Sequence, residues 1–188
     1  IKQNTGLKRL LTLATLNNLF AIGAAALFIP LFEQEFSATA YGIFMAIMGA
    51  GSLAGFLITP EIDKRHTKRL FVTSALLFPA LFIIITMTYE LLWMHILIFL
   101  AGLFNGVVNV FFMPAIQAAT PEKFRGKVMS VSEMFILGGM PLGLLISGAI
   151  AELLNVRLAM TILYSCALLI TILVGPSKAL LETVDFNR

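Results

Sequence analysis

The sequence predicts an all-α membrane protein whose six transmembrane helices form a 3+3 inverted repeat. Three observations predict it: six long apolar runs, a one-sided distribution of basic residues, and a pattern that recurs after 88 positions. The composition agrees, because 59% of the 188 residues are hydrophobic and only 12% are charged, whereas soluble domains carry about 25% charged residues. This balance excludes a soluble enzyme, a nucleic-acid-binding protein and a disordered tail.

Six apolar runs bounded by charged residues or proline define the predicted helices. A helix needs about 20 apolar residues to cross a hydrocarbon core of roughly 30 Å. The predicted helices are 10–32, 38–59, 70–88, 91–113, 128–151 and 158–174. Residues 1–9 are then a flank that ends a linker, 10–174 are the bundle, and 175–188 are a carboxy-terminal tail.

Each predicted helix has a local justification in the sequence. The first follows Lys8 and Arg9, and five similar runs after it distinguish it from a signal peptide. The second ends before Pro60. The first and fourth carry asparagines, and the second and fifth carry glycines. The third and sixth contain no glycine, amide or charged residue, which predicts that they face lipid.

The basic residues lie almost entirely on one side of the predicted bundle. Twelve of the thirteen Lys and Arg lie in the amino-terminal flank, the second-to-third loop, the fourth-to-fifth loop and the tail. The other side has only Arg157, together with four glutamates. The positive-inside rule therefore predicts that both termini are cytoplasmic.

A repeat relates the two groups of three helices. The run from Gly51 to Ile58 lines up with the run from Gly139 to Ile146, and the same offset carries Asn17 onto Asn105. Because three is odd, the second unit crosses the membrane in the opposite sense, as in transporters that bind substrate near the bilayer midplane. The alternative is that Gly-x-x-x-Gly recurs in membrane helices for packing alone.

The stretch 120–130, which reads TPEKFRGKVMS, is the most specific in the chain, and Gly139-Met-Pro141-Leu-Gly143 follows it. With these motifs the chain resembles the carboxy-terminal six helices of a major facilitator superfamily transporter. The similar branch includes bacterial macrolide exporters and the enterobactin exporter. The resemblance implies half of a 12-helix fold in a bacterial inner membrane. Its partner would be an amino-terminal six-helix half, supplied upstream or by a second chain.

The same resemblance suggests a latch in the cytoplasmic loops, where an acid precedes several bases. An alternative is that these loops only set the topology. The latch candidates are Asp63, Arg65, Lys68, Arg69, Glu122 and Arg125.

The amides of the first and fourth helices are the main candidates for a substrate path, because an amide at membrane depth needs a protein or water partner. Interhelical hydrogen bonding is the alternative. The candidates are Asn17, Asn18, Asn105, Asn109, Phe20, Phe104 and Met113.

Two further features bear on transport. Glu133 lies inside the fifth predicted helix and is a candidate proton-coupling or gate residue, unless it only pairs with a nearby loop cation. Gly139, Pro141 and Gly143 predict a bend in the same helix, although static close packing would need the same glycines.

These expectations define a secondary active transporter half that exports drug-like or lipophilic compounds, such as macrolides, by proton-coupled alternating access. Its partners are the second half, the bilayer, a small-molecule substrate and protons. No enzyme activity, nucleic acid, metal or cofactor is expected, and the chain has no Gly-x-x-x-x-Gly-Lys-Ser/Thr loop for ATP. The alternative is a non-transporting six-helix membrane protein, such as a channel subunit or an assembly factor.

Overall fold

The computed structural model describes residues 5–63 and 66–175, and every regular element in these ranges is a helix. The α-helices are α1 (Thr5–Ala26), α2 (Phe28–Glu35), α3 (Ala38–Ile58), α4 (Thr67–Met87), α5 (Leu91–Ala118), α6 (Arg125–Gly138), α7 (Met140–Leu153) and α8 (Val156–Val174). Two short 3₁₀ helices, Thr59–Glu61 and Glu122–Phe124, lie in the connections.

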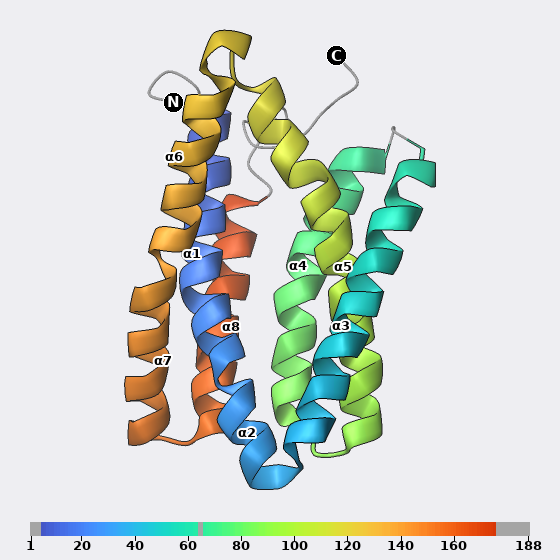
Figure 1. The fold of residues 1–188 in the computed structure, drawn as a ribbon, viewed down its shortest axis with the longest axis vertical. Coiled ribbons are helices and arrows are strands. Elements are labelled where there is room, and N and C mark those ends of the chain that lie inside the picture. The colour runs from blue at the N-terminus through green and yellow to red at the C-terminus, as the bar shows by residue number, and fades with distance from the viewer. Residues whose placement is uncertain (1–4, 64–65, 176–188) are drawn as a thin grey trace.

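Among the described residues, the helices form six segments, and these run along the long axis of the molecule (Figure 1). Five of them are long and apolar enough to cross a bilayer, and the first of these, Thr5–Glu35, combines α1 with α2. The sixth segment is α6 followed end to end by α7, and α7 is an apolar helix shorter than the five candidate spans. The all-α membrane fold predicted from the sequence is therefore confirmed.

Two segments that the sequence predicts as single helices are each divided in the structure, and the second division falls in the run Gly139–Gly143 where a bend is expected. The first is divided at Leu27, between α1 and α2, and the fifth at Gly139, between α6 and α7. Proline explains both positions, because it has no N–H for the carbonyl four residues earlier. Pro30 cannot donate a hydrogen bond to the carbonyl oxygen of Ala26, where α1 ends. Pro141 lies in the first turn of α7.

Side-chain caps set two of the tight connections at one end of the bundle. The Ala40 N–H donates to Ser37 Oγ at 3.1 Å and begins α3. The Leu158 N–H donates to Asn155 Oδ1 at 2.9 Å and begins α8. Each cap satisfies one backbone donor that a helix start leaves open, so the chain reverses direction within two or three residues.

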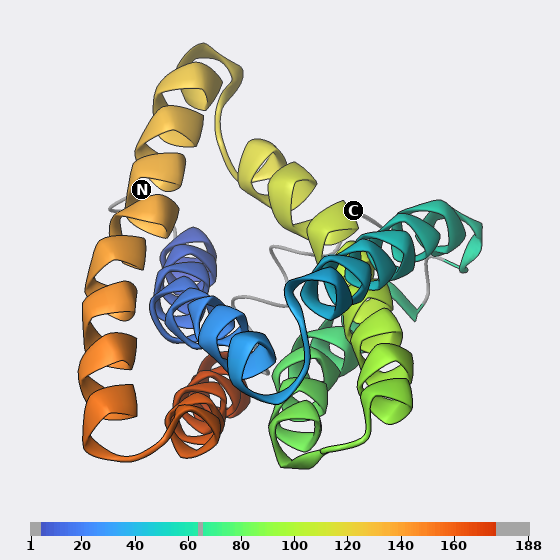
Figure 2. The same ribbon diagram turned by 60° about the horizontal axis from the view of Figure 1, so that its bottom comes forward.

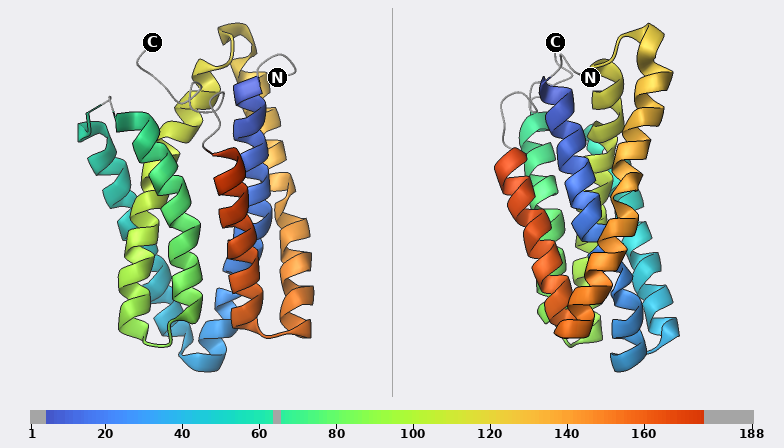
Figure 3. Two further views of the ribbon diagram at one scale, coloured as in Figure 1. Left: turned by 180° about the vertical axis from the view of Figure 1, so that it is seen from behind. Right: turned by 90° about the vertical axis from the view of Figure 1, so that its left-hand side faces the viewer.

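The helices pack as two groups (Figure 2). In one group α1 packs along α7 and α8, and in the other α5 packs along α3 and α4; α4 and α8 join the groups. Figure 3 shows α1 beside α8 and α5 beside α4. The repeat offset relates α1 to α5, the α6–α7 segment to α3, and α8 to α4. The packing of α1 along α7 and α8 therefore has its counterpart in the packing of α5 along α3 and α4. The predicted 3+3 inverted repeat is thus present in the packing.

Glycines let the repeat-related helix pairs approach closely. A Cβ added at Gly51 would lie 2.2 Å from the Phe99 carbonyl oxygen on α5, and one at Gly55 would lie 2.2 Å from that of Leu103. In the other group, a Cβ at Gly143 would lie 2.1 Å from the Leu19 carbonyl oxygen on α1. These glycines hold backbones in direct contact, as small residues do between membrane helices.

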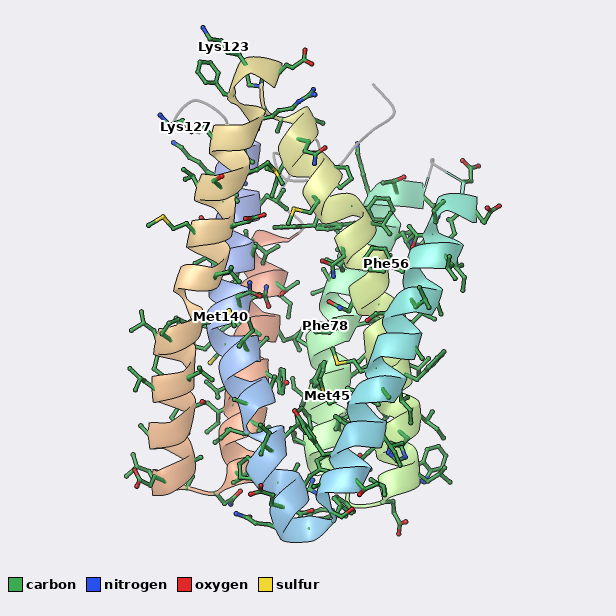
Figure 4. The ribbon with its side chains drawn as sticks, in the orientation of Figure 1. Met45, Phe56, Phe78, Lys123, Lys127 and Met140 are labelled. Carbon is green, nitrogen blue, oxygen red and sulfur yellow. The ribbon has the colours of Figure 1, made fainter. Side chains whose placement is uncertain are left out.

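The two ends of the bundle differ in charge. The basic end carries the start of α1, the turn before α6 with Lys123, and the first turn of α6 with Lys127 (Figure 4). The acidic end carries the connections after α2, α4 and α7, with Glu35 and Glu90 among its residues. An apolar core packs toward each end, one around Phe71 and one around Phe82.

Candidate substrate pathway

A cavity of about 240 Å³ lies between the two helix groups, and we call it the amide cavity. It is bounded by α1, α4, α5 and α8. All four predicted asparagines line it, as does Met113. Its walls are formed by Leu10, Leu13, Ala14, Asn17, Asn18, Ala21, Phe71, Ala75, Phe78, Asn105, Val108, Asn109, Phe112, Met113 and Thr171.

Hydrogen bonds between helices fix two of these amides. Asn17 Nδ2 donates to Thr171 Oγ1 of α8 at 3.1 Å. Asn105 Nδ2 donates to Ser52 Oγ of α3 at 3.4 Å. Asn17 and Asn105 therefore both form interhelical hydrogen bonds and line the cavity. An amide offers two donors and one acceptor oxygen, so each of these side chains has hydrogen-bonding groups beyond the one that its interhelical contact uses.

The third amide contact lies within one helix. Asn109 Nδ2 donates to the Asn105 carbonyl oxygen at 2.9 Å and to Asn105 Oδ1 at 3.2 Å. The two side chains lie one turn apart on the same face of α5, as residues four apart do. They form a continuous polar strip along an otherwise apolar wall.

The amides lie near the middle of the bundle. Along α1, Asn18 follows Lys8 by ten residues and precedes Glu33 by fifteen. At 1.5 Å per residue these separations are about 15 Å and 22 Å, which places Asn18 near half depth between the charged ends.

A second cavity of about 440 Å³ lies next to the first toward the acidic end, and we call it the aromatic cavity. The two cavities share Asn18, Ala21, Phe78 and Asn105 as wall residues. Phe78 and Met45 lie in the space between the helix groups (Figure 4). The aromatic cavity is lined by Asn18, Ala21, Ile22, Ala25, Ala26, Phe28, Tyr41, Phe44, Met45, Met48, Phe78, Phe82, Asn105 and Tyr164.

Two of the predicted pathway residues and the predicted proton-coupling residue lie away from both cavities. Phe20 packs against the core at the acidic end, and Phe104 is half-buried on α5; neither lines either cavity. Glu133 is exposed on α6 and also lines neither. No Asp, Glu, Lys, Arg or His is among the described residues that line the two cavities, so the walls are neutral.

The predicted latch residues lie in the connections at the basic end. Asp63 is exposed after α3, and its carbonyl oxygen accepts the His66 N–H at 2.9 Å. Arg65 lies outside the described residues. Lys68 and Arg69 lie in the first turn of α4, where Arg69 is exposed. Glu122 and Arg125 are exposed around the 3₁₀ turn before α6.

Sequence reasoning missed a contact around Arg157 at the acidic end. Its guanidinium pairs with the Glu35 carboxylate of α2, with Arg157 Nε 2.7 Å from Glu35 Oε1. The same guanidinium donates to the carbonyl oxygens of Thr86 at 2.7 Å and Thr88 at 2.8 Å, and it lies 4.1 Å from the ring centroid of Tyr89. The signal was present in the sequence, since Arg157 is the one cation predicted on this side.

Two helices predicted to face lipid also line the cavities. α4 supplies Phe71 and Phe78, and α8 supplies Tyr164 and Thr171. Thr171 and Tyr164 are each among the few polar groups of the sixth predicted helix. A polar side chain in an otherwise apolar span is the signal that would have found them.

An inverted repeat of six helical segments, with neutral cavities at mid-depth between its two groups, is typical of a transporter-type membrane protein. The family model of the Major Facilitator Superfamily matches residues 11–181. The chain therefore belongs to the major facilitator superfamily, whose members are in general secondary transporters. No curated protein and no solved structure matches the chain.

Proposed function

We propose that the chain is one half of a proton-coupled transporter that exports lipophilic, drug-like compounds such as macrolides across a bacterial inner membrane. The observation that carries the proposal is the pair of adjoining neutral cavities at mid-depth between two symmetry-related helix groups. Aromatic and methionine side chains suit bulky apolar substrates, and the amides supply a few directional contacts.

In an alternating-access cycle, the two divided helices would bend at their breaks. The breaks at Leu27 and Gly139 are points where the halves of a membrane-spanning segment can change their relative angle. In the proposed cycle, the contacts of Arg157 with Glu35 and with the end of α4 hold the acidic end closed. Opening that end requires these contacts to separate while the basic end closes.

In the proposed cycle, proton coupling uses a group outside the two cavity walls, because the described residues of these walls include no carboxylate and no histidine. On this chain we keep Glu133 as the candidate, and we assign its exposed face of α6 to contact with the second six-helix half. Gly42 and Gly49 on α3 and Gly148 on α7 also face open space. This open face fits a partner that covers α3, α6 and α7. We further place the basic end, with both termini, in the cytoplasm.

The test is drug accumulation in bacterial cells that lack their own major exporters and express the full-length protein. We expect wild type to lower the accumulation of erythromycin and of a lipophilic dye, and an uncoupler to abolish the difference. Asn105→Ala should weaken export about fivefold, the effect of losing one hydrogen bond between the protein and the substrate. Leu173→Ala, an exposed α8 residue outside both cavities, is the matched control and should export normally.

The proposal fails if cells with wild-type protein accumulate the same amount of every tested compound as cells with an empty vector. Export by wild type that resists the uncoupler would contradict proton coupling alone. Unchanged export by Glu133→Gln would remove that residue from coupling and leave the pathway in place.

A further inference from the structure

The side-chain amide of Asn109 is held in one orientation by a backbone carbonyl. Its Nδ2 lies 2.9 Å from the carbonyl oxygen of Asn105, one turn earlier on α5. The opposite orientation would place two acceptor oxygens at this distance, where they form no hydrogen bond and repel each other. The same nitrogen lies 3.2 Å from Asn105 Oδ1. Asn109 therefore uses its donor group within α5 and leaves its side-chain oxygen for other partners.

That oxygen is open to a ligand in the amide cavity. Asn109 is an exposed residue that lines this cavity. Because its nitrogen is turned toward the backbone of α5, the oxygen is the outer atom of the exposed amide. Among the described residues, every hydrogen bond of this side chain uses the nitrogen. The oxygen thus depends on water in the empty cavity, and on the substrate when the cavity is filled.

The neighbouring amides are not restricted to accepting. Asn105 accepts from Asn109 and donates one hydrogen to Ser52 Oγ, so it keeps a second hydrogen. Asn17 donates one hydrogen to Thr171 Oγ1 and keeps a second hydrogen as well. Of these three amides, Asn109 is the one whose donor group is engaged twice. It can offer a substrate only its oxygen.

The apolar surroundings make an unmatched oxygen costly. Phe71, Phe78 and Phe112 line the same cavity, and Val108 is the neighbour of Asn109 in the wall. A lipophilic substrate that fills this space displaces water from the Asn109 oxygen. A substrate with an N–H or O–H group restores the hydrogen bond, whereas one without such a group leaves the oxygen unsatisfied. A polar group of this kind discriminates between compounds of similar size and apolar area.

We propose that Asn109 selects substrates that carry an N–H or O–H group, by accepting a hydrogen bond from that group at its side-chain oxygen. This inference rests on the proposed transport function and narrows its substrate class from lipophilic compounds in general to lipophilic hydrogen-bond donors. Erythromycin, which carries several hydroxyl groups, belongs to the narrower class. The aromatic cavity adjoins the amide cavity and accommodates the apolar remainder of the substrate.

The experiment measures efflux of two related dyes by the full-length protein. Rhodamine 6G carries N–H groups, and rhodamine B ethyl ester has ethyl groups in place of these hydrogens. Both have the same ring system and the same delocalised positive charge. We expect the apparent KM of wild type to be about fivefold lower for rhodamine 6G, the factor of one hydrogen bond. Asn109→Leu, which replaces the amide by an apolar group of similar size, should bring the two KM values within about twofold of each other.

The readout is the ratio of the two KM values, so the amount of protein in the membrane cancels. Gln117→Leu is the matched control, because Gln117 is an exposed amide of the same helix that lines neither cavity, and it should keep the wild-type ratio. Asn109→Ala tests the same loss without added bulk.

A wild-type ratio in both Asn109 variants would overturn the inference, as would equal KM values for the two dyes in wild type. Erythromycin export by wild type in either case would leave the proposed transport function standing. Absence of export for every compound would overturn the transport function and, with it, the inference.

Discussion

Arg157 and Glu35 are separated by 122 positions in the sequence, and they form a two-point ion pair at the acidic end of the bundle. The pair joins α8 to α2, and the same guanidinium holds the carbonyl oxygens that end α4. One side chain thereby ties together the two helix groups at the end where the aromatic cavity lies. The Arg157 side chain is 11% exposed and that of Glu35 is 30% exposed, so water competes only partly for these contacts.

Loss of Arg157 should destabilise the fold. We expect Arg157→Ala to lower the melting temperature in detergent by about 5 °C, which corresponds to about 2 kcal/mol for a chain of this size. The cause is that one carboxylate and two carbonyl oxygens lose their donors. Arg157→Lys keeps the positive charge but lacks the planar guanidinium, so it should recover less than half of the melting temperature lost in Arg157→Ala. Glu35→Gln should cost less than Arg157→Ala, since the carbonyl contacts remain. A melting temperature equal to wild type in Arg157→Ala would show that this contact carries no stability.

The glycines on α3 give a matched pair, because two of them lie two residues apart in different surroundings. A Cβ at Gly51 would lie 2.2 Å from the Phe99 carbonyl oxygen, whereas a Cβ at Gly49 would meet nothing within 4 Å. Gly51→Ala should therefore force α3 and α5 apart and sharply reduce the amount of folded protein in the membrane. Gly49→Ala should accumulate like wild type. The measurement is the folded fraction by size-exclusion chromatography, and equal yields for both variants would contradict the close approach of α3 to α5.

The positions of the helices could be predicted from features that are visible in the sequence. Long apolar runs, charges at their ends and the Gly51/Gly139 repeat define where the chain crosses and which helices correspond. The two breaks are less visible, because Pro30 and Pro141 divide a helix whereas Pro79 and Pro114 lie inside α4 and α5, which continue past them. Whether a proline divides a helix depends on how the neighbouring helices hold the two ends.

The site was harder to predict, because in a membrane both the protein interior and the lipid are apolar. Hydrophobic patterning therefore does not show which face of an apolar helix points inward. The four asparagines were found because an amide at that depth stands out. Tyr164 and Phe78 were missed because their helices otherwise lack strong polar groups, and Phe20 was chosen from its helix alone. The pairing of Arg157 with Glu35 could be recognised only from the fold, which brings the two residues together.

The sidedness of the loops can be measured by labelling. In full-length protein without other cysteines, including Cys166→Ser, we expect Glu90→Cys to react with a membrane-impermeant maleimide in whole cells. Lys123→Cys should react only after the membrane is opened, because the two positions lie at opposite ends of the bundle. Lys123→Cys that reacts in whole cells as fast as Glu90→Cys would refute the proposed orientation.

The central claim is that the amide and aromatic cavities form one substrate path, and cysteine protection tests it most directly. Met113 lines the first cavity and Met45 the second, while Leu173 is 71% exposed and lines neither. We predict that a small thiol reagent modifies Met113→Cys and Met45→Cys, and that erythromycin slows both reactions while leaving Leu173→Cys unaffected. Reaction rates at Met113→Cys and Met45→Cys that erythromycin does not change, in protein that exports erythromycin, would contradict the account.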